Sequence, residues 1–224
     1  MCGIVASRDK LKLLELIDAN KSRGSNSWSL TVIDLNDMSL KAIFKEKQNI
    51  KKGQIKRLIS QINCDNPYYI IHMQAQTTNS TRVHPATNDN YMLWHNGIIK
   101  DKDIKRLQES QKDNEEWDTQ LILNEIYKYY KPGSDFNHHI ANSIANINGG
   151  IAAILWTGEN IYIFRNSTSI LYTNILGDLS SVNYYNEMTE VKRNSVYEMN
   201  KDCDFIYKES FKSIDNAYYF PGET

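Results

Sequence analysis

The chain has 224 residues, of which 41% are hydrophobic and 24% charged, and these proportions fit one globular domain or at most two small ones. Its formal net charge of −1 gives no electrostatic reason to expect a nucleic acid or an anionic membrane as partner. The chain has three cysteines without a C-x-x-C pair and no apolar run of about 18 residues. Its first segment, MCGIVASRDK, lacks the features of a signal peptide. Together these features predict a protein of the reducing cytoplasm.

The first half of the chain predicts short strands with helices between them. Apolar or alternating strands are expected at residues 3–6, 28–35, 40–44, 68–72 and 91–94. Helices are expected from Leu11 to about Arg23-Gly24, where glycine suits a C-terminal cap, and over residues 54–62.

The second half predicts helices first and strands afterwards. Periodic apolar residues favour helices over residues 101–108, 118–130 and 135–147. Strands are expected over residues 151–156, 160–164 and 170–173, with shorter ones to about residue 207. Strands, then helices, then strands indicate an α+β fold rather than a repeated βαβ unit.

Cys2 is the first candidate for chemistry, because removal of Met1 would leave it with both a thiol and a free α-amine. The unperturbed pKa of such an amine, about 7.7–8.0, lets it act as the base for a thiol with a pKa of about 8.5. The alternative is an apolar cysteine that begins a buried strand, and Cys-Gly-Ile-Val alone does not decide between the two.

His95-Asn96-Gly97 follows a predicted strand and also has two interpretations. Asn-Gly is a common hairpin turn. A glycine N–H beside an asparagine amide can equally direct two hydrogen bonds at the negative oxygen that develops during acyl transfer.

Two further segments carry polar groups at the ends of predicted elements. Arg23-Gly24-Ser25-Asn26-Ser27 is either a helix end with a solvated arginine or a loop of a site. Asp118 opens a predicted helix, where a carboxylate either caps the helix or binds the α-ammonium group of a substrate.

In their order and spacing these segments resemble the glutaminase domain of class II glutamine amidotransferases, such as that of glucosamine-6-phosphate synthase. The family pattern runs Met-Cys-Gly-Ile, Arg-Gly-x-Asp-Ser, His-Thr-Arg-x-x-Thr, His-Pro, His-Asn-Gly-x-Ile and Asp-Thr-Glu. The matching segments, within residues 2–205, are Met1–Ile4, Arg23–Ser27, His72–Thr77, His84-Pro85, His95–Ile99 and Asp118–Gln120.

The resemblance implies the N-terminal nucleophile (Ntn) hydrolase fold, a four-layer α/β/β/α sandwich of two mainly antiparallel sheets. The domain is expected over residues 2–210, with residues 211–224 as a C-terminal tail. The Cys2 strand is expected to lie centrally, with the thiol in the cleft where the strand that begins near Tyr91 ends.

The resemblance also implies roles for individual residues. Cys2 would be the nucleophile and would form a γ-glutamyl thioester that water hydrolyses after ammonia leaves. Asn96 and Gly97 would form the oxyanion hole, Arg23 would support the nucleophile, and Asp118 would bind the α-ammonium group of glutamine. No cofactor or metal is implied for this step.

One departure from the family concerns the α-carboxylate of glutamine. Gln74 stands where the family has the arginine that binds this carboxylate, and Thr77 closes the same motif. Neutral hydrogen bonding then replaces a bidentate charged pair, a loss of roughly 1–3 kcal/mol. Arg82, further along the loop, is the candidate for supplying the missing charge, and an unchanged Michaelis constant for glutamine in Arg82→Ala would exclude it.

Three functions remain open on these residues. The first is a glutaminase subunit that passes ammonia to a separate synthetase or acceptor-binding subunit. The second is a stand-alone amidohydrolase for another γ-glutamyl or small amide, which Gln74 would suit. The third is a binding or regulatory protein that keeps the fold without turnover, and ammonia release from glutamine separates it from the first two.

Overall fold

The computed structural model describes residues 2–75, 82–89, 91–128, 130, 133–184, 188–200 and 202–214. The helices in these ranges are α1 (Lys10–Asn20), α2 (Lys52–Ser60), α3 (Asp101–Gln111), α4 (Asp118–Lys128) and α5 (Phe136–Ala145), and a single 3₁₀ turn (Lys21–Arg23) follows α1. The described strands form two sheets, and every strand pairing within them is antiparallel.

Each of the two sheets combines strands from both halves of the chain. The seven-stranded sheet has the order β11 (Thr189–Glu190), β9 (Tyr172–Thr173), β10 (Leu179–Ser180), β1 (Gly3–Ser7), β4 (Pro67–Gln74), β2 (Ser27–Asp34), β3 (Ser39–Glu46). The six-stranded sheet has the order β13 (Phe205–Ser210), β12 (Ser195–Met199), β8 (Ile161–Arg165), β7 (Ala152–Trp156), β6 (Met92–Asn96), β5 (Ala86–Thr87). The strand that follows Cys2 is therefore central in its sheet.

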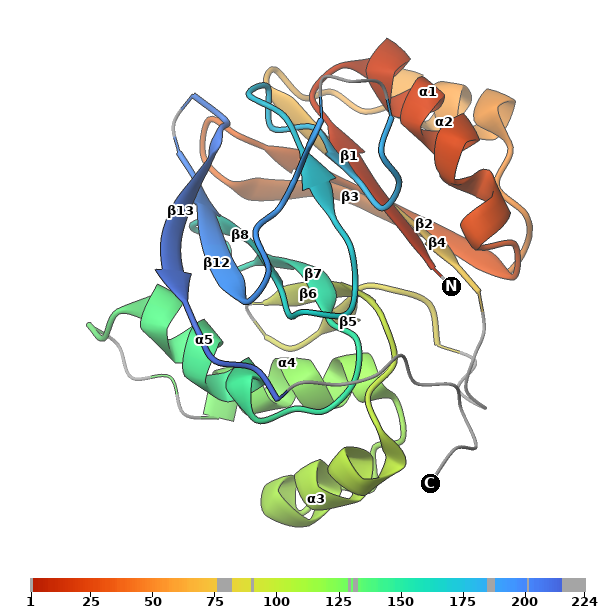
Figure 1. Cartoon of the computed structure of the whole chain (residues 1–224). Coiled ribbons are helices and arrows are strands. Elements are labelled where there is room, and N and C mark those ends of the chain that lie inside the picture. The colour runs from red at the N-terminus through yellow and green to blue at the C-terminus, as the bar shows by residue number, and fades with distance from the viewer. Residues whose placement is uncertain are drawn as a thin grey trace.

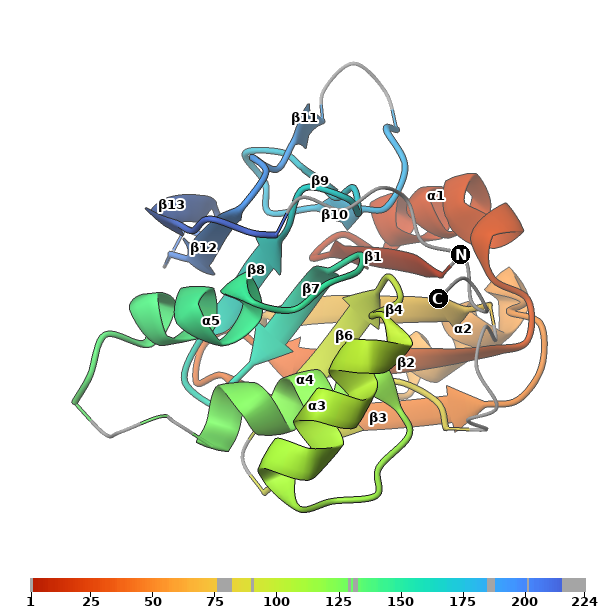
Figure 2. The same cartoon turned by 60° about the horizontal axis from the view of Figure 1, so that its bottom comes forward.

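The sheets pack face to face, and helices cover their outer faces (Figures 1 and 2). Helices α1 and α2 lie on the seven-stranded sheet, and α4 and α5 lie against the six-stranded sheet on the other side of the molecule, where α3 packs on α4. The hydrophobic side chains form three clusters that match this layering, one under each helical layer and one between the sheets.

The side chains of β1 point alternately to the two faces of the sheet, and both faces of this strand are apolar. Ile4 and Ala6 belong to the cluster between the sheets, whereas Val5 belongs to the cluster under α1 and α2. All three side chains are fully buried. Because successive residues of a strand point to opposite faces, one apolar strand contributes to two cores, as a covered sheet requires.

The expected fold class is confirmed, and most expected elements occur with boundaries shifted by a few residues. Three details differ. The strand expected over residues 170–173 is only Tyr172–Thr173, the short strand β5 is not among the expected strands, and residues 215–224 of the predicted tail lie outside the described part.

Gly24 follows the 3₁₀ turn as its C-cap residue, but the reason for glycine at this position differs from the one that a helix cap predicts. The helix ends at Asn20, and Gly24 has an extended backbone with φ −158°. Its need for glycine comes from packing, because a Cβ at this position would lie 2.3 Å from the carbonyl oxygen of Met73 in β4. Gly24 therefore lets the chain after α1 pass close to the strand beside Cys2.

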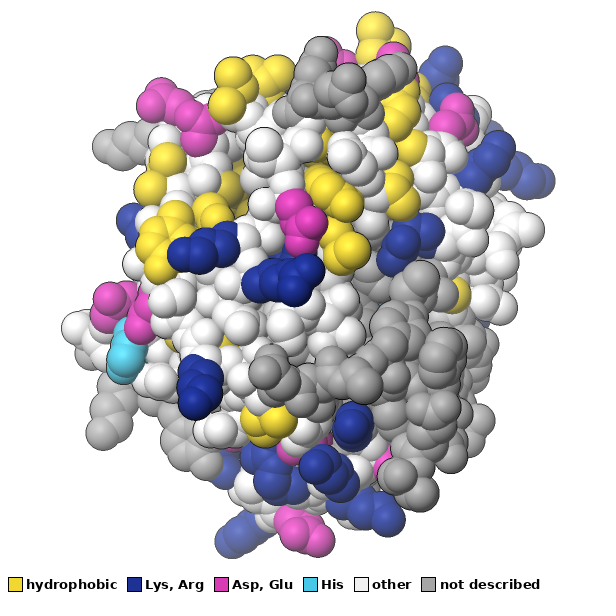
Figure 3. Space-filling model, viewed as in Figure 1, with side chains coloured by type: hydrophobic (Ala, Val, Ile, Leu, Met, Phe, Trp, Pro, Cys, Tyr) yellow, Lys and Arg dark blue, Asp and Glu magenta, His cyan; other side chains and the backbone are white. Residues whose placement is uncertain are grey.

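On the face seen in Figure 3, charged side chains of both signs are interspersed, and Lys and Arg side chains gather with a few acidic ones over α3. Within the described part, no helix has the length and apolar character that crossing a membrane requires.

Candidate active site

Cys2 lies immediately before β1 and next to the end of β4. The antiparallel register sets Gly3 opposite Met73, which brings Cys2 beside Gln74 and Ala75. The thiol donates a hydrogen bond to the Ala75 carbonyl, with an Sγ–O distance of 3.6 Å, and the residue is 7% exposed. Burial raises the pKa of the Cys2 thiol to about 11, so this thiol is protonated at neutral pH unless a neighbouring base takes its proton.

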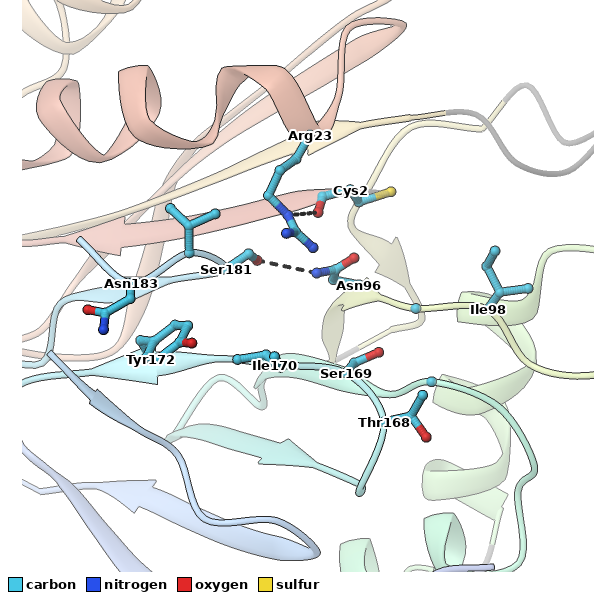
Figure 4. A pocket seen from close by; sticks show the side chains of 13 residues that line it. Cys2, Arg23, Asn96, Ile98, Thr168, Ser169, Ile170, Tyr172, Ser181 and Asn183 are labelled. Atoms are coloured by element: carbon cyan, nitrogen blue, oxygen red, sulfur yellow. Dashed lines mark hydrogen bonds between the residues drawn. The ribbon is translucent and has the colours of Figure 1, made fainter. Parts of the chain in front are cut away.

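Asn96 and Gly97 lie across from Cys2, where β6 of the other sheet ends. Gly97 has φ +148°, and a Cβ there would lie 1.9 Å from the Gly150 carbonyl oxygen, so this turn requires glycine. Cys2, Asn96 and Gly97 all line one cavity of about 470 Å³ (Figure 4). Cys2 and the Asn-Gly turn are thus brought together from opposite sheets.

Ser181 connects these two parts of the site. Its hydroxyl accepts hydrogen bonds from the Ile4 backbone N–H at 2.9 Å and from Asn96 Nδ2 at 3.3 Å, and its own backbone N–H donates to the Ile4 carbonyl. These bonds orient the Asn96 side-chain amide relative to the strand that follows Cys2 (Figure 4).

Arg23 lies at the end of the 3₁₀ turn after α1. Its Nε donates to the Cys2 carbonyl oxygen at 2.9 Å, and it lines the same 470 Å³ cavity. In Figure 4 the Cys2 sulfur points away from this guanidinium group. Arg23 therefore bonds to the backbone of the candidate nucleophile.

A second, smaller cavity lies on the side to which the thiol points. Its volume is about 20 Å³, close to that of one water molecule. It is lined by Cys2, Gln74, Ala75, His84, His95, Gly97, Trp117, Asp118 and Thr119. Cys2 and Gly97 border both cavities, so the two are neighbours around the thiol and the turn.

Asp118 and Gln74 contribute two of the polar side chains that line the smaller cavity. Asp118 is the first residue of α4, is buried, and accepts a 2.8 Å hydrogen bond from the Thr119 N–H. Gln74 ends β4, and its Oε1 accepts from Ser27 Oγ at 3.1 Å and contacts His84 Nδ1 at 3.4 Å.

Three buried histidines support this region. The rings of His72 and His84 stack with 3.7 Å between their centres. Burial lowers the pKa of His72 to about 3 and that of His84 well below its usual value, so both rings are neutral. His95 lies with Nε2 3.0 Å from the Gly150 carbonyl and Nδ1 3.9 Å from the Asp118 carboxylate.

Arg82 does not lie with the other candidate residues. Its guanidinium forms an ion pair of 2.6 Å with Glu115, and its side chain is 55% exposed. It lines a different cavity, together with Lys45 and Lys47, and is not among the residues that line either cavity at Cys2. Thr77, the other candidate of this loop, lies outside the described residues.

The structure adds residues that sequence reasoning did not single out. Ser181 and Ser27 bond to Asn96 and Gln74, respectively, and Thr119 contacts His84 Nε2 at 3.0 Å. His84 and His95 appeared in the sequence only as parts of matched segments. No local pattern marks Ser181, because its partners are far away in the chain.

Comparison with solved structures finds the same fold in two enzymes. One is the glutamine phosphoribosylpyrophosphate (PRPP) amidotransferase from B. subtilis complexed with ADP and GMP, with a TM-score of 0.68 and 14% identity over 93% of this chain and 49% of that chain. The other is an allosteric regulatory enzyme of purine biosynthesis, with a TM-score of 0.69 and 15% identity over 93% of this chain and 48% of that chain.

This chain thus spans about half the length of the two solved structures. No protein-family model matches the sequence, and comparison with curated proteins finds no relative. At these identities the likeness establishes the fold, and it confirms the Ntn hydrolase-like fold that the resemblance implied.

Proposed function

We propose that this chain is an N-terminal cysteine amidohydrolase of the glutaminase type, which hydrolyses the side-chain amide of glutamine or of a glutamine derivative. The observation that carries the proposal is the common cavity of Cys2, Asn96 and Gly97, formed where a central strand of one sheet meets the end of a strand in the other. A cysteine that shares a cavity with an asparagine amide and a glycine N–H supplies the nucleophile and the oxyanion donors that acyl transfer needs.

In the proposed mechanism the active chain begins at Cys2, whose own α-amine takes the proton of the thiol. In the chain that carries Met1, burial raises the pKa of the Cys2 thiol to about 11, so the reaction needs a group that removes the thiol proton. The thiolate attacks the amide carbon, and Asn96 Nδ2 and the Gly97 N–H donate to the oxygen that becomes negative.

The amine then returns the proton to the departing ammonia, which leaves a thioester on Cys2. Water hydrolyses this thioester and regenerates the thiol. Arg23 keeps Cys2 in position through its bond to the Cys2 carbonyl. Asp118 binds the α-ammonium group of the substrate, and Gln74 lies beside it in the smaller cavity.

Transfer of the ammonia to a separate synthetase remains part of this proposal. Co-purification of such a partner, with faster ammonia release in its presence, would support transfer. A rate that no co-purified protein changes would favour a stand-alone amidohydrolase.

The experiment that tests the chemistry measures ammonia release from glutamine and glutamine derivatives, with purified protein whose intact mass shows that Met1 is absent. We expect release by the wild type and none above background in Cys2→Ala. Cys64→Ala is the matched control, because Cys64 lines neither cavity at Cys2. Release that survives in Cys2→Ala would overturn the proposal, and so would an inactive wild type.

A further inference from the structure

The charged side chains around Cys2 limit which charged groups a substrate can have near its reacting amide. Of the described residues that line the two cavities, Asp118 is the only acidic one, and Arg23 is the only lysine or arginine. The Arg23 guanidinium bonds to the Cys2 backbone in the larger cavity, on the side from which the sulfur points away (Figure 4). The smaller cavity, toward which the thiol points, contains a carboxylate and no lysine or arginine among the described residues.

Gln74 offers a neutral donor in the smaller cavity. Its side chain is buried, and its Oε1 is occupied by the Ser27 hydroxyl and by His84 Nδ1. With the ring proton of His84 on Nδ1, both neighbours donate to Oε1, and the Nε2 group remains for a ligand. An amide N–H binds a carbonyl oxygen well, but it does not neutralise a carboxylate.

No lysine or arginine lines the smaller cavity among the described residues. Arg82 is paired with Glu115 in another cavity, and residues 76–81, between Ala75 and Arg82, contain neither lysine nor arginine. His84 is neutral, and the nitrogens of His95 face Gly150, Thr119 and Asp118. A substrate carboxylate beside Gln74 would therefore be buried next to Asp118 without a charged partner, which is costly.

We propose, resting on the function proposed above, that the substrate is a glutamine unit with a free α-ammonium group and a capped α-carboxyl group. The amino-terminal glutamine of a peptide is the simplest example. Asp118 receives the ammonium group and Gln74 Nε2 donates to the α-carbonyl oxygen. The smaller cavity holds about one water molecule, so side chains around it move when the α-carbon binds.

The reaction is balanced without any further reactant. The Cys2 sulfur bonds to the side-chain carbonyl carbon, the C–N bond breaks, and the thiol proton leaves with ammonia. Water then cleaves the thioester, so a terminal glutamine becomes a terminal glutamate and ammonium is released. The α-carbonyl bond to the next residue stays intact.

The test compares kcat/KM for ammonia release from L-glutamine, its α-amide, the dipeptide Gln-Gly and N-acetyl-Gln-Gly. We expect the α-amide and the dipeptide to exceed free glutamine by about tenfold or more, since only free glutamine places an unpaired charge beside Gln74. The acetylated peptide, without an ammonium group, is expected to lose about as much again.

Gln74→Arg is the matched variant, and we expect it to shift the preference toward free glutamine. Gln74→Leu, which has no donor, should lower kcat/KM for the capped substrates while leaving the thiol reactive. If wild-type protein cleaves free glutamine as well as or better than its α-amide, the capped-substrate inference is wrong and the amidohydrolase proposal stands. If none of the amides releases ammonia, both fail together.

Discussion

At the scale of single residues, the histidines behind Cys2 make the stability of the protein depend on pH. His72 and His84 are buried and neutral in the folded state, whereas the unfolded chain binds a proton at each below about pH 6.5. The unfolded state thus gains protons first as the pH falls. The stability that these rings contribute is fully present above pH 6.5 and is lost as the pH falls, for His72 toward pH 3.

We expect the free energy of unfolding to fall below pH 6.5 by about 1.4 kcal/mol per pH unit for each of these two histidines. Urea denaturation at several pH values measures this slope. His84→Gln should have a shallower slope than the wild type, even if it is less stable at pH 7.5. The exposed His138, paired with Glu209, serves as control, and a slope equally reduced in His138→Gln would contradict the assignment.

At the scale of elements, the turn that ends β6 depends on glycine at position 97. Because a Cβ there would lie 1.9 Å from the Gly150 carbonyl oxygen and 2.8 Å from His95 Nε2, Gly97→Ala forces the backbone of the turn to move. We expect ammonia release to fall by about 10² or more, since one oxyanion donor is displaced. Gly53→Ala in α2, where a Cβ meets nothing within 4 Å, should leave the rate unchanged. Equal rates for the two variants would exclude Gly97 from the oxyanion hole.

Most helices and strands could be predicted from the sequence, since strand alternation and apolar spacing report burial directly. The sequence also showed Cys2 at the start of an apolar strand and Asn96-Gly97 at the end of another. Ser181 was not, because its role comes from hydrogen bonds to Ile4 and Asn96 across the fold. Gly24 was assigned to a helix cap because local patterns cannot show that β4 passes close by.

Arg82 shows that ion pairs between distant residues could not be predicted from the sequence either. Its place in a polar loop near the matched segments suggested that it could reach the substrate, and in the structure its charge is paired with Glu115. A single sequence shows which charges are close along the chain, but not which acidic partner each will meet in the fold.

At the scale of the whole molecule, the core between the sheets holds the two halves of the site at a fixed separation. Ile154 of β7 is fully buried in this core. We expect Ile154→Ala to lower the free energy of unfolding by about 2–5 kcal/mol, through lost burial and a cavity. Ile175→Ala is the control, because Ile175 is 83% exposed and should change stability by less than about 0.5 kcal/mol. Equal effects in chemical denaturation would argue against a tightly packed inter-sheet core.

The most direct measurement for the central claim is the mass of the N-terminal peptide from enzyme quenched in acid during turnover of glutamine or its α-amide. We predict a peptide that begins at Cys2, with a fraction carrying one added acyl group from the substrate on the Cys2 sulfur. An acyl group found on another residue, or ammonia release by a chain that still begins with Met1, would contradict the account.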